Sequence, residues 1–343
     1  MQTLIGKASI LLEALPYIKN FYGETFVIKY GGSAFTDENL RTLFAKDIVL
    51  LKYIGINPII VHGGGPQISS FLKKLNIPTE FVGGLRITTK EVMQIVEMVL
   101  CGFVNKDIVS LINSHGGNAV GISGKDANLL FVKKVFTQKY LKNLGIEENV
   151  KKDVGYVGEI IKVKPEILKK LIEDKFIPVI APIGVGIDYQ EETKLATYNI
   201  NADLAAGEIA ASLPSRKLII LTDVEGLKIE TNKLKNLLNS FKDYKILKEK
   251  ENEIINIKDN NKVLLKFKKL DENFYLISKF SLKFLNTFIQ KGIIKGGMIP
   301  KLLSCKTALK RGVRKAHIIN GKVPHSILLE IFTKEGVGTE IVL

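Results

Sequence analysis

The residues best suited to chemistry are three consecutive glycines that follow an apolar, β-branched run. Residues 58–62 read Pro-Ile-Ile-Val-His, residues 63–65 are all glycine, and Pro66 follows at a position typical of a first helical turn. Glycines carry no Cβ, so an anion can approach their backbone N–H groups, and a helix start adds the positive end of its dipole. We therefore predict a phosphate-binding strand end; the alternative is a flexible turn.

A second strand end repeats this pattern. Residues 26–33 begin with a short apolar run, continue with Lys29, and end with Gly31, Gly32 and a serine. Two such strand ends predict a polyanion held between two loops.

Two further charged residues stand beside predicted helix starts. Lys301 follows Gly-Gly-Met-Ile-Pro at residues 296–300, and Asp203 opens an apolar helix just after Asn201. The alternatives are a solvated lysine, an aspartate that complements the helix dipole and an asparagine N-cap.

Common nucleotide-binding motifs are missing from the sequence. It contains no GxxxxGK[ST], no GxGxxG after a strand and no protein-kinase signature set. The glycine loops therefore predict a phosphate binder of another design.

Hydrophobic patterns predict an α/β fold with a mostly parallel central sheet. Strands are expected at residues 27–30, 59–62, 119–123, 177–183, 218–223 and 316–320, and helices at 38–53, 88–113, 165–174, 202–213 and 300–311. Alternation of these elements is typical of a parallel sheet. Residues 127–163 alternate as antiparallel hairpins beside it.

Composition adds the broad class. A chain of 343 residues, 46% of them apolar, can bury a large core in two lobes. Cys101 and Cys305 lie in helical patterns without a Cys/His cluster, which predicts a reducing compartment and no metal site. The apolar run at 177–187 is too short to cross a bilayer. Residues 1–20 read as an amphipathic helix rather than a targeting peptide, so we expect a soluble protein.

The formal charge of +15 leaves a nucleic-acid binder as an alternative. The lysines are scattered, however, and occur with abundant Ile and Asn, as AT-rich coding produces. We expect neither a nucleic-acid nor a membrane partner.

Six motifs together resemble the amino-acid kinase superfamily, and its acetylglutamate kinases in particular. They lie at residues 28–32, 61–66, 84–86, 199–203, 221–226 and 296–301. The resemblance covers nearly the whole chain except about residues 229–274. It implies an open αβα sandwich and phosphorylation of the γ-carboxylate of N-acetyl-L-glutamate by ATP with Mg²⁺, the second step of arginine synthesis.

The same resemblance assigns roles to individual residues. Lys29 and Lys301 would stabilise the transferred phosphoryl group, and Asp203 would hold both lysines. Gly64, Gly65, Arg86 and Asn199 would bind the amino-acid substrate. The residues expected at the nucleotide are Gly31, Gly32, Thr222, Asp223, Gly226, Leu227, Gly297 and Met298. A substrate carboxylate with a pKa near ~4.3 is already ionised at neutral pH, so no general base is expected, and His62 is not needed as one.

The resemblance also implies a division of the chain and its regulation. Residues 21–190 would bind the amino acid and residues 191–343 would bind ATP. A helix at residues 1–20 and a C-terminal segment with His317, Glu330 and Gly338 are features of arginine-inhibited members, which are hexamers built as trimers of dimers. A PII-type signalling protein is a further partner that the resemblance allows.

Some expectations stay open at this point. Residues 229–274 form a lineage-specific insertion, either a hairpin from 254–257 and 263–267 or a mobile surface segment. The AT-rich composition fits a plastid-encoded protein of the stroma or a bacterial cytoplasmic one. The rival functions are another amino-acid kinase, acting on glutamate or carbamate, and a basic nucleic-acid binder.

Overall fold

The expected parallel sheet forms the centre of the molecule. The computed structural model describes residues 2–32, 37–138, 140, 153–186, 196–239, 241, 244–249, 254–259, 262–333 and 336–343. Six parallel neighbours lie side by side in the order β17, β11, β1, β2, β8 and β5. Their bounds are β1 Thr25–Tyr30, β2 Asn57–His62, β5 Ala119–Ser123, β8 Ile177–Ala181, β11 Ser215–Thr222 and β17 Lys315–Asn320. All six were predicted from the sequence.

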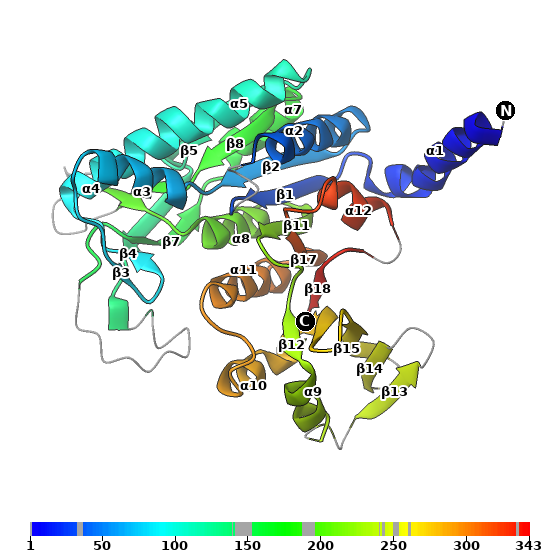
Figure 1. Ribbon diagram of the computed structural model, residues 1–343. Coiled ribbons are helices and arrows are strands. Elements are labelled where there is room, and N and C mark those ends of the chain that lie inside the picture. The colour runs from blue at the N-terminus through cyan, green and yellow to red at the C-terminus, as the bar shows by residue number, and fades with distance from the viewer. Residues whose placement is uncertain are drawn as a thin grey trace.

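Helices cover both faces of this sheet because its buried strands present apolar side chains on both sides. In β1, Phe26 and Ile28 join one hydrophobic cluster and Val27 joins the other. Figure 1 shows α2 to α5 above the sheet and α8 and α11 below it. The bounds are α2 Glu38–Tyr53, α3 Gly65–Lys74, α4 Lys90–Glu97, α5 Asn105–Ser114, α7 Glu166–Glu173, α8 Ala202–Ser212, α9 Thr231–Leu238, α10 Leu285–Gln290, α11 Met298–Lys310 and α12 Ser326–Phe332. The predicted αβα sandwich is confirmed.

One predicted helix has an internal irregularity that the sequence pattern did not show. The segment expected as a single helix at residues 88–113 consists of α4, a π-helix η2 at Met98–Val104, and α5. The apolar periodicity of one π turn is too close to that of an α turn to be separated in a short window. Such turns occur frequently at functional sites.

The predicted hairpin region forms a second, small sheet. β6 Leu130–Lys134 pairs antiparallel with β7 Gly158–Val163, and β9 Ile183–Gly186 and β10 Ala196–Asn199 complete the order β10, β9, β6, β7. The strand expected at 177–183 ends at Ala181, and Ile183 already begins β9, so the chain passes from the central sheet to the small sheet at Pro182. A short turn, η3 Asp126–Asn128, precedes β6, and β3 Phe81–Val82 pairs with β4 Leu85–Arg86.

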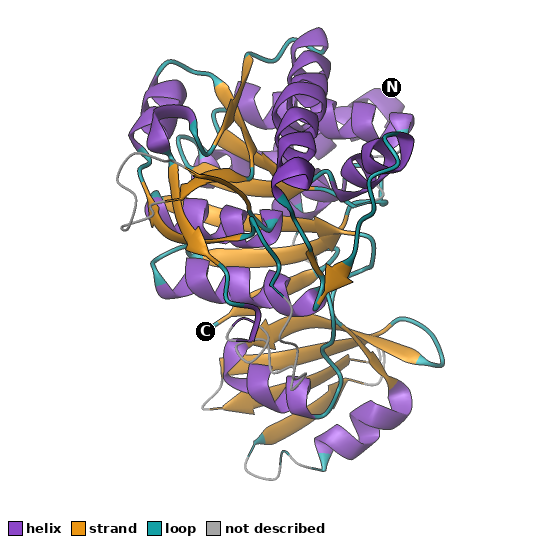
Figure 2. Cartoon of the chain, turned by 90° about the vertical axis from the view of Figure 1, so that its left-hand side faces the viewer, coloured by secondary structure: helices purple, strands orange, loops and turns teal. Residues whose placement is uncertain are grey.

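The segment predicted as an insertion extends the central sheet. In the described part of the chain, β14 and β15 pair as a hairpin, which is one of the two alternatives that the sequence left open. β15 also pairs with β16, β16 with β18, and β18 with β17 of the central sheet. Figure 2 shows these strands below the main body. The bounds are β12 Lys228–Glu230, β13 Lys245–Glu249, β14 Ile254–Asp259, β15 Lys262–Lys269, β16 Phe274–Ser281, η4 Leu282–Phe284 and β18 Thr339–Val342.

The N-terminal helix predicted at residues 1–20 is present as α1 Gln2–Phe21. It projects from the body of the molecule (Figure 1), and near its end Tyr17 packs edge-on against Phe332, the last residue of α12, with ring centroids 6.3 Å apart. None of the described helices combines the length and apolar character needed to span a bilayer.

Candidate active site and effector cavity

The glycine loop lies between β2 and α3, as the sequence predicts. Gly64 precedes the first residue of α3, Gly65, and Pro66 occupies the first turn. A Cβ on Gly64 would lie 2.5 Å from the Leu100 side chain of η2, whereas a Cβ on Gly65 would meet nothing within 4 Å. The π-helix therefore packs directly against the loop, and the loop leaves open space at Gly65, where backbone N–H groups of a helix start can bind an anion.

A buried histidine and asparagine fix the start of this loop. The side-chain amide nitrogen of Asn105 lies 3.1 Å from His62 Nε2, and His62 Nδ1 lies 2.8 Å from the Gly63 carbonyl oxygen. Asn105 donates to Nε2, so Nδ1 carries the proton and donates to Gly63. In a planar peptide the carbonyl and the next N–H point in opposite directions. His62 therefore also sets the direction of the Gly64 N–H.

Asp203 joins two lysines from separate elements. Its carboxylate oxygens lie 3.1 Å from Lys29 Nζ of β1 and 2.7 Å from Lys301 Nζ of α11. Ser304 donates to the Asp203 carbonyl, and Asn201 caps α8 by accepting from the Asp203 N–H, as its N-cap interpretation predicts. All three charged side chains are at most 14% exposed. The structure therefore brings together the three residues that the sequence grouped as catalytic.

Electrostatics in this trio are set by burial and by the neighbouring charges. Burial disfavours the charged form of Asp203, but Lys29 and Lys301 outweigh it and hold the carboxyl pKa below its usual value. Burial lowers the pKa of Lys29, and the charge of Lys301 lowers it further, against the attraction of Asp203. The arrangement places positive charge next to a glycine loop, as a transferred phosphoryl group requires.

A cavity of about 210 Å³ opens beside the glycine loop. Gly64, Gly65, Arg86 and Asn199 all line it, so the four predicted substrate-binding residues are brought together. The Arg86 guanidinium donates to the Thr79 and Ser69 hydroxyls and to the Gly65 carbonyl, and it stacks 4.6 Å from the Phe81 ring centroid. These contacts fix the guanidinium in the cavity wall, and its burial lowers its pKa.

The predicted nucleotide residues divide into two groups. A Cβ on Gly31 would lie 3.0 Å from Lys29 Nζ, and one on Gly32, whose φ is +81°, would lie 2.4 Å from an Asp223 carboxylate oxygen. Gly31 therefore lies beside Lys29, and Gly32 lies beside Asp223, which follows Thr222 at the end of β11. Gly297 and Met298 begin α11, three residues before Lys301.

Gly226 and Leu227 lie instead against β18. The Leu227 N–H donates to Thr339 Oγ1 at 2.8 Å, and the Leu227 side chain is buried. Their contacts fix the chain after β11 to the core.

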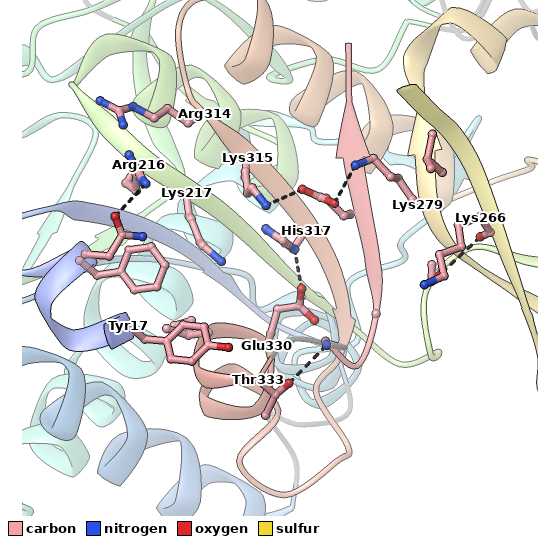
Figure 3. Close-up of a pocket in the computed structure, with 18 of the residues that line it drawn as sticks. Tyr17, Arg216, Lys217, Lys266, Lys279, Arg314, Lys315, His317, Glu330 and Thr333 are labelled. Atoms are coloured by element: carbon pink, nitrogen blue, oxygen red, sulfur yellow. Dashed lines mark hydrogen bonds and ion pairs between the residues drawn. The ribbon is translucent and has the colours of Figure 1, made fainter. Parts of the chain in front are cut away.

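The three residues predicted for arginine also lie together. His317 of β17 is 2.5 Å from Glu330 of α12, whose other oxygen accepts from the Val337 N–H at 2.8 Å, and Gly338 follows directly. They line a cavity of about 770 Å³ that Tyr17 of α1 also borders (Figure 3). Burial lowers the pKa of His317, and His317 helps to hold the pKa of Glu330 below its usual value although burial opposes this.

Sequence reasoning missed Asn105, Ser304 and Tyr140. Asn105 opens α5 and Ser304 lies within α11, and neither is marked in the sequence by a glycine or a spacing signal. Burial, followed by the charge of Asp203, raises the pKa of Tyr140 to about 12.

Comparison with known proteins agrees with this geometry. The model of the family described as "Amino acid kinase family" matches residues 24–251 and 249–320. The acetylglutamate kinases of Sulfurihydrogenibium sp. and Aquifex aeolicus are each 49% identical to this chain, over 347 and 346 residues, with 100% of both chains covered.

Solved structures share the fold at lower identity. N-acetylglutamate synthase from Neisseria gonorrhoeae, complexed with coenzyme A and N-acetyl-glutamate, has a TM-score of 0.69 at 21% identity; the match covers 98% of this chain and 63% of the synthase. The same synthase complexed with coenzyme A and L-arginine has a TM-score of 0.66, again at 21% identity. That match covers 98% of this chain and 65% of the synthase. Carbamate kinase from Giardia lamblia bound to AMP-PNP has a TM-score of 0.56 at 16% identity. That match covers 93% of this chain and 98% of the carbamate kinase.

The fold and the set of Lys29, Asp203 and Lys301 are those of a phosphotransferase, and the chain belongs to the amino acid kinase family. Within that family it groups with the acetylglutamate kinases, at full-length identities near one half.

Proposed function

We propose that this chain transfers the γ-phosphoryl group of ATP to the γ-carboxylate of N-acetyl-L-glutamate, a step of arginine biosynthesis. The observation that carries the proposal is Asp203, which holds Lys29 and Lys301 beside the glycine loops. The full-length likeness to acetylglutamate kinases supports the choice of substrate.

The chemical step needs alignment and charge stabilisation. The substrate carboxylate is already ionised at neutral pH, so it can attack without a base. Lys29 would stabilise the phosphoryl group from the substrate side and Lys301 from the nucleotide side, while Asp203 keeps the two ammonium groups close. Two ammonium groups about 6 Å apart repel by roughly 3 kcal/mol at an effective dielectric constant of ~20. N–H groups of Gly64 and Gly65 would bind the charge that develops in the transition state.

Substrate selection would reside in the smaller cavity. The Arg86 guanidinium, fixed by its hydroxyl partners, would meet the substrate α-carboxylate, because a planar guanidinium suits a carboxylate. Asn199 would hydrogen-bond the same amino-acid moiety from the opposite wall.

ATP would lie along the ends of β1 and β11 and the start of α11. Gly31, Gly32, Thr222, Asp223, Gly297 and Met298 would border it, with Gly226 and Leu227 supporting the loop. Mg²⁺ would accompany the ATP phosphates, where it neutralises charge. Residues 21–190 would form the amino-acid lobe and 191–343 the nucleotide lobe; the boundary at 190 lies outside the described residues.

The larger cavity would be the site of feedback inhibition by L-arginine. Glu330 supplies a carboxylate for a guanidinium, and α1 forms one wall. The Neisseria synthase that shares this fold was solved with L-arginine. We propose that α1 also interlaces dimers into a hexamer, a trimer of dimers, and that a PII-type protein is a further partner. The bacterial origin of the relatives favours the bacterial cytoplasm over a plastid.

A substrate panel tests the proposed reaction. ADP release would be measured with N-acetyl-L-glutamate, glutamate, aspartate, carbamate and UMP side by side under identical ATP and Mg²⁺ concentrations. We expect turnover with N-acetyl-L-glutamate alone. Turnover with glutamate or carbamate instead would assign the chain to another amino-acid kinase activity.

A further inference from the structure

The π-helix η2 directs two side chains at the glycine loop. The backbone N–H of Asn105 donates to the carbonyl oxygen of Leu100, five residues earlier, as a π turn requires. In a continuous α-helix, side chains five residues apart point about 140° away from each other, because each residue turns by about 100°. The wider π turn brings both onto one side of the helix. Leu100 therefore packs on Gly64 while Asn105 reaches His62.

The buried Asn105 side chain joins the ends of three neighbouring strands. Its amide nitrogen lies 2.9 Å from the Val179 carbonyl oxygen of β8 and 3.1 Å from His62 Nε2 of β2. A Cβ on Gly121 of β5 would overlap Asn105 Oδ1, so a glycine is needed there to leave room for the amide. Two strands contact the amide, and the third is shaped to admit it.

The chemistry of its partners fixes which way round this amide lies. Lys106 Nζ is 3.2 Å from Asn105 Oδ1, and an ammonium group can only donate. The Val179 carbonyl can only accept, so the amide nitrogen must point toward Val179 and His62. His62 Nε2 therefore accepts, and His62 Nδ1 carries the proton that it donates to the Gly63 carbonyl oxygen. Hydrogen bonds run in one direction from Lys106 to Gly63.

This chain of hydrogen bonds ends at the loop that faces the substrate cavity. The Gly63 N–H donates to the Tyr30 carbonyl oxygen at 2.8 Å, so both backbone polar groups of Gly63 are held. With the proton on Nε2 instead, His62 Nδ1 and the Gly63 carbonyl oxygen would be two acceptors facing each other at 2.8 Å. The peptide between Gly63 and Gly64 would then turn, and the Gly64 N–H would turn with it.

We propose that Asn105 is a positioning residue for phosphoryl transfer, which acts through the proton position of His62 on the direction of the Gly64 N–H. The inference rests on the proposed function and adds to it a residue behind the cavity wall. Gly63 and Gly64 line that cavity, whereas neither His62 nor Asn105 is among its described lining residues. An N–H that is aimed before the reaction stabilises developing charge without the cost of reorganisation.

Steady-state kinetics test the positioning role. Asn105→Ala removes the donor to His62 and should lower kcat/KM for N-acetyl-L-glutamate about 10- to 100-fold, because the Gly64 N–H loses its fixed direction. The matched control is Asn113→Ala on the same helix, where Asn113 hydrogen-bonds the backbone of Ala119 at the start of β5. The control should lower the stability to urea but keep kcat/KM. An equal loss of kcat/KM in both variants would overturn the proposal.

Nitrogen-15 NMR of the histidine-labelled full-length chain at neutral pH measures the proton position directly. The His62 signals are assigned by their loss in His62→Gln. We expect a protonated Nδ1 and an unprotonated Nε2 in the unaltered chain. Asn105→Asp places an acceptor at the same position, so Nε2 should become protonated and kcat/KM should fall. A protonated Nε2 in the unaltered chain, or unchanged ring signals in Asn105→Asp, would overturn the proposal even where Asn105→Ala fails to fold.

Failure of the positioning role is distinguishable from failure of the proposed function. An unaltered chain that releases no ADP with N-acetyl-L-glutamate would refute the proposed function, and with it the reaction that Asn105 serves. An active unaltered chain whose Asn105→Ala variant keeps its kcat/KM would refute the positioning role alone.

Discussion

At the scale of single residues, the site depends on side chains that are charged yet almost fully buried. Asp203 stays ionised because two ammonium groups compensate for its desolvation. Breaking such a buried set by removing one partner leaves an uncompensated charge. His62 is the opposite case, because it is buried in its neutral form and serves the backbone of the glycine loop.

Replacing Lys301 tests its proposed role in the transition state. Lys301→Ala should lower kcat by about 100- to 1000-fold, the cost of losing one donor to developing charge. Steady-state kinetics with N-acetyl-L-glutamate and ATP would measure it, and circular dichroism would check the fold. Lys310→Ala, an exposed change at the end of the same helix, is the control. Near-normal turnover of the Lys301 variant would refute the assignment.

The buried His62 should make stability depend on pH. Burial lowers its pKa to about 4, whereas an unfolded histidine titrates near 6.5, so the unfolded chain takes up the proton first as pH falls. Its stabilising contribution is complete above pH 6.5 and is lost progressively toward pH 4. Urea unfolding should show a loss of about 2 kcal/mol between pH 7 and pH 5 from this residue.

The variant His62→Gln should lack this part of the pH dependence. His115→Gln, which changes a half-buried histidine away from the loop, should retain it. Identical pH profiles for the two variants would show that His62 is not the residue responsible. Loss of loop positioning should also raise KM in His62→Gln more than in His115→Gln.

At the scale of elements, helix starts and strand ends do most of the positioning. Asp203, Gly65 and Met298 stand at the starts of α8, α3 and α11, and Lys29 lies near the end of β1. The carboxyl ends of parallel strands gather at one edge of a sheet, which is where ligands bind in open α/β folds. α1 lies at a different site, because Tyr17 and Phe21 near its end line the cavity of about 770 Å³ that His317 and Glu330 also line, which we call the effector cavity.

Removing α1 should separate regulation from catalysis. A chain lacking residues 1–20 should keep its kinase activity and lose inhibition by L-arginine, since Tyr17 and the rest of that wall are gone. Initial rates over a range of arginine concentrations would measure this. Inhibition unchanged from that of the full chain would contradict a site at α1.

At the scale of the whole molecule, one sheet connects the two cavities. β11 carries Lys217 near its start, at the effector cavity, and Thr222 at its end, at the active site. An effector bound at one end therefore contacts the same strand that borders the proposed nucleotide site. This continuity gives the two sites a shared rigid element.

The proposed assembly predicts a definite mass. Light scattering should give six times the 38.1 kDa of the chain for the full protein and twice that value after removal of residues 1–20. The substitution Tyr17→Ala, which keeps the helix but removes its packing on Phe332, is an intermediate test. A truncated chain with the full hexameric mass would exclude α1 as the link between dimers.

The sequence by itself determined the elements and the chemistry of the loops. Six parallel strands follow from apolar runs that must be buried on both faces, and the roles proposed for glycines 31, 32, 64 and 65 rest on the missing Cβ. Periodicity could not reveal the π turn at 98–104, because one π turn inside an apolar helix keeps nearly the pattern of an α turn. It also could not show that the chain changes sheets after Ala181, because both strands are apolar.

Tertiary structure alone decided which distant residues meet. Lys29, Asp203 and Lys301 are far apart in sequence, and only packing of α8 against β1 and α11 brings their charges within 3.1 Å. The same holds for Asn105 with His62. Local sequence fixes backbone preference over a few residues, whereas these contacts depend on sheet order and strand register, which burial of the whole core determines.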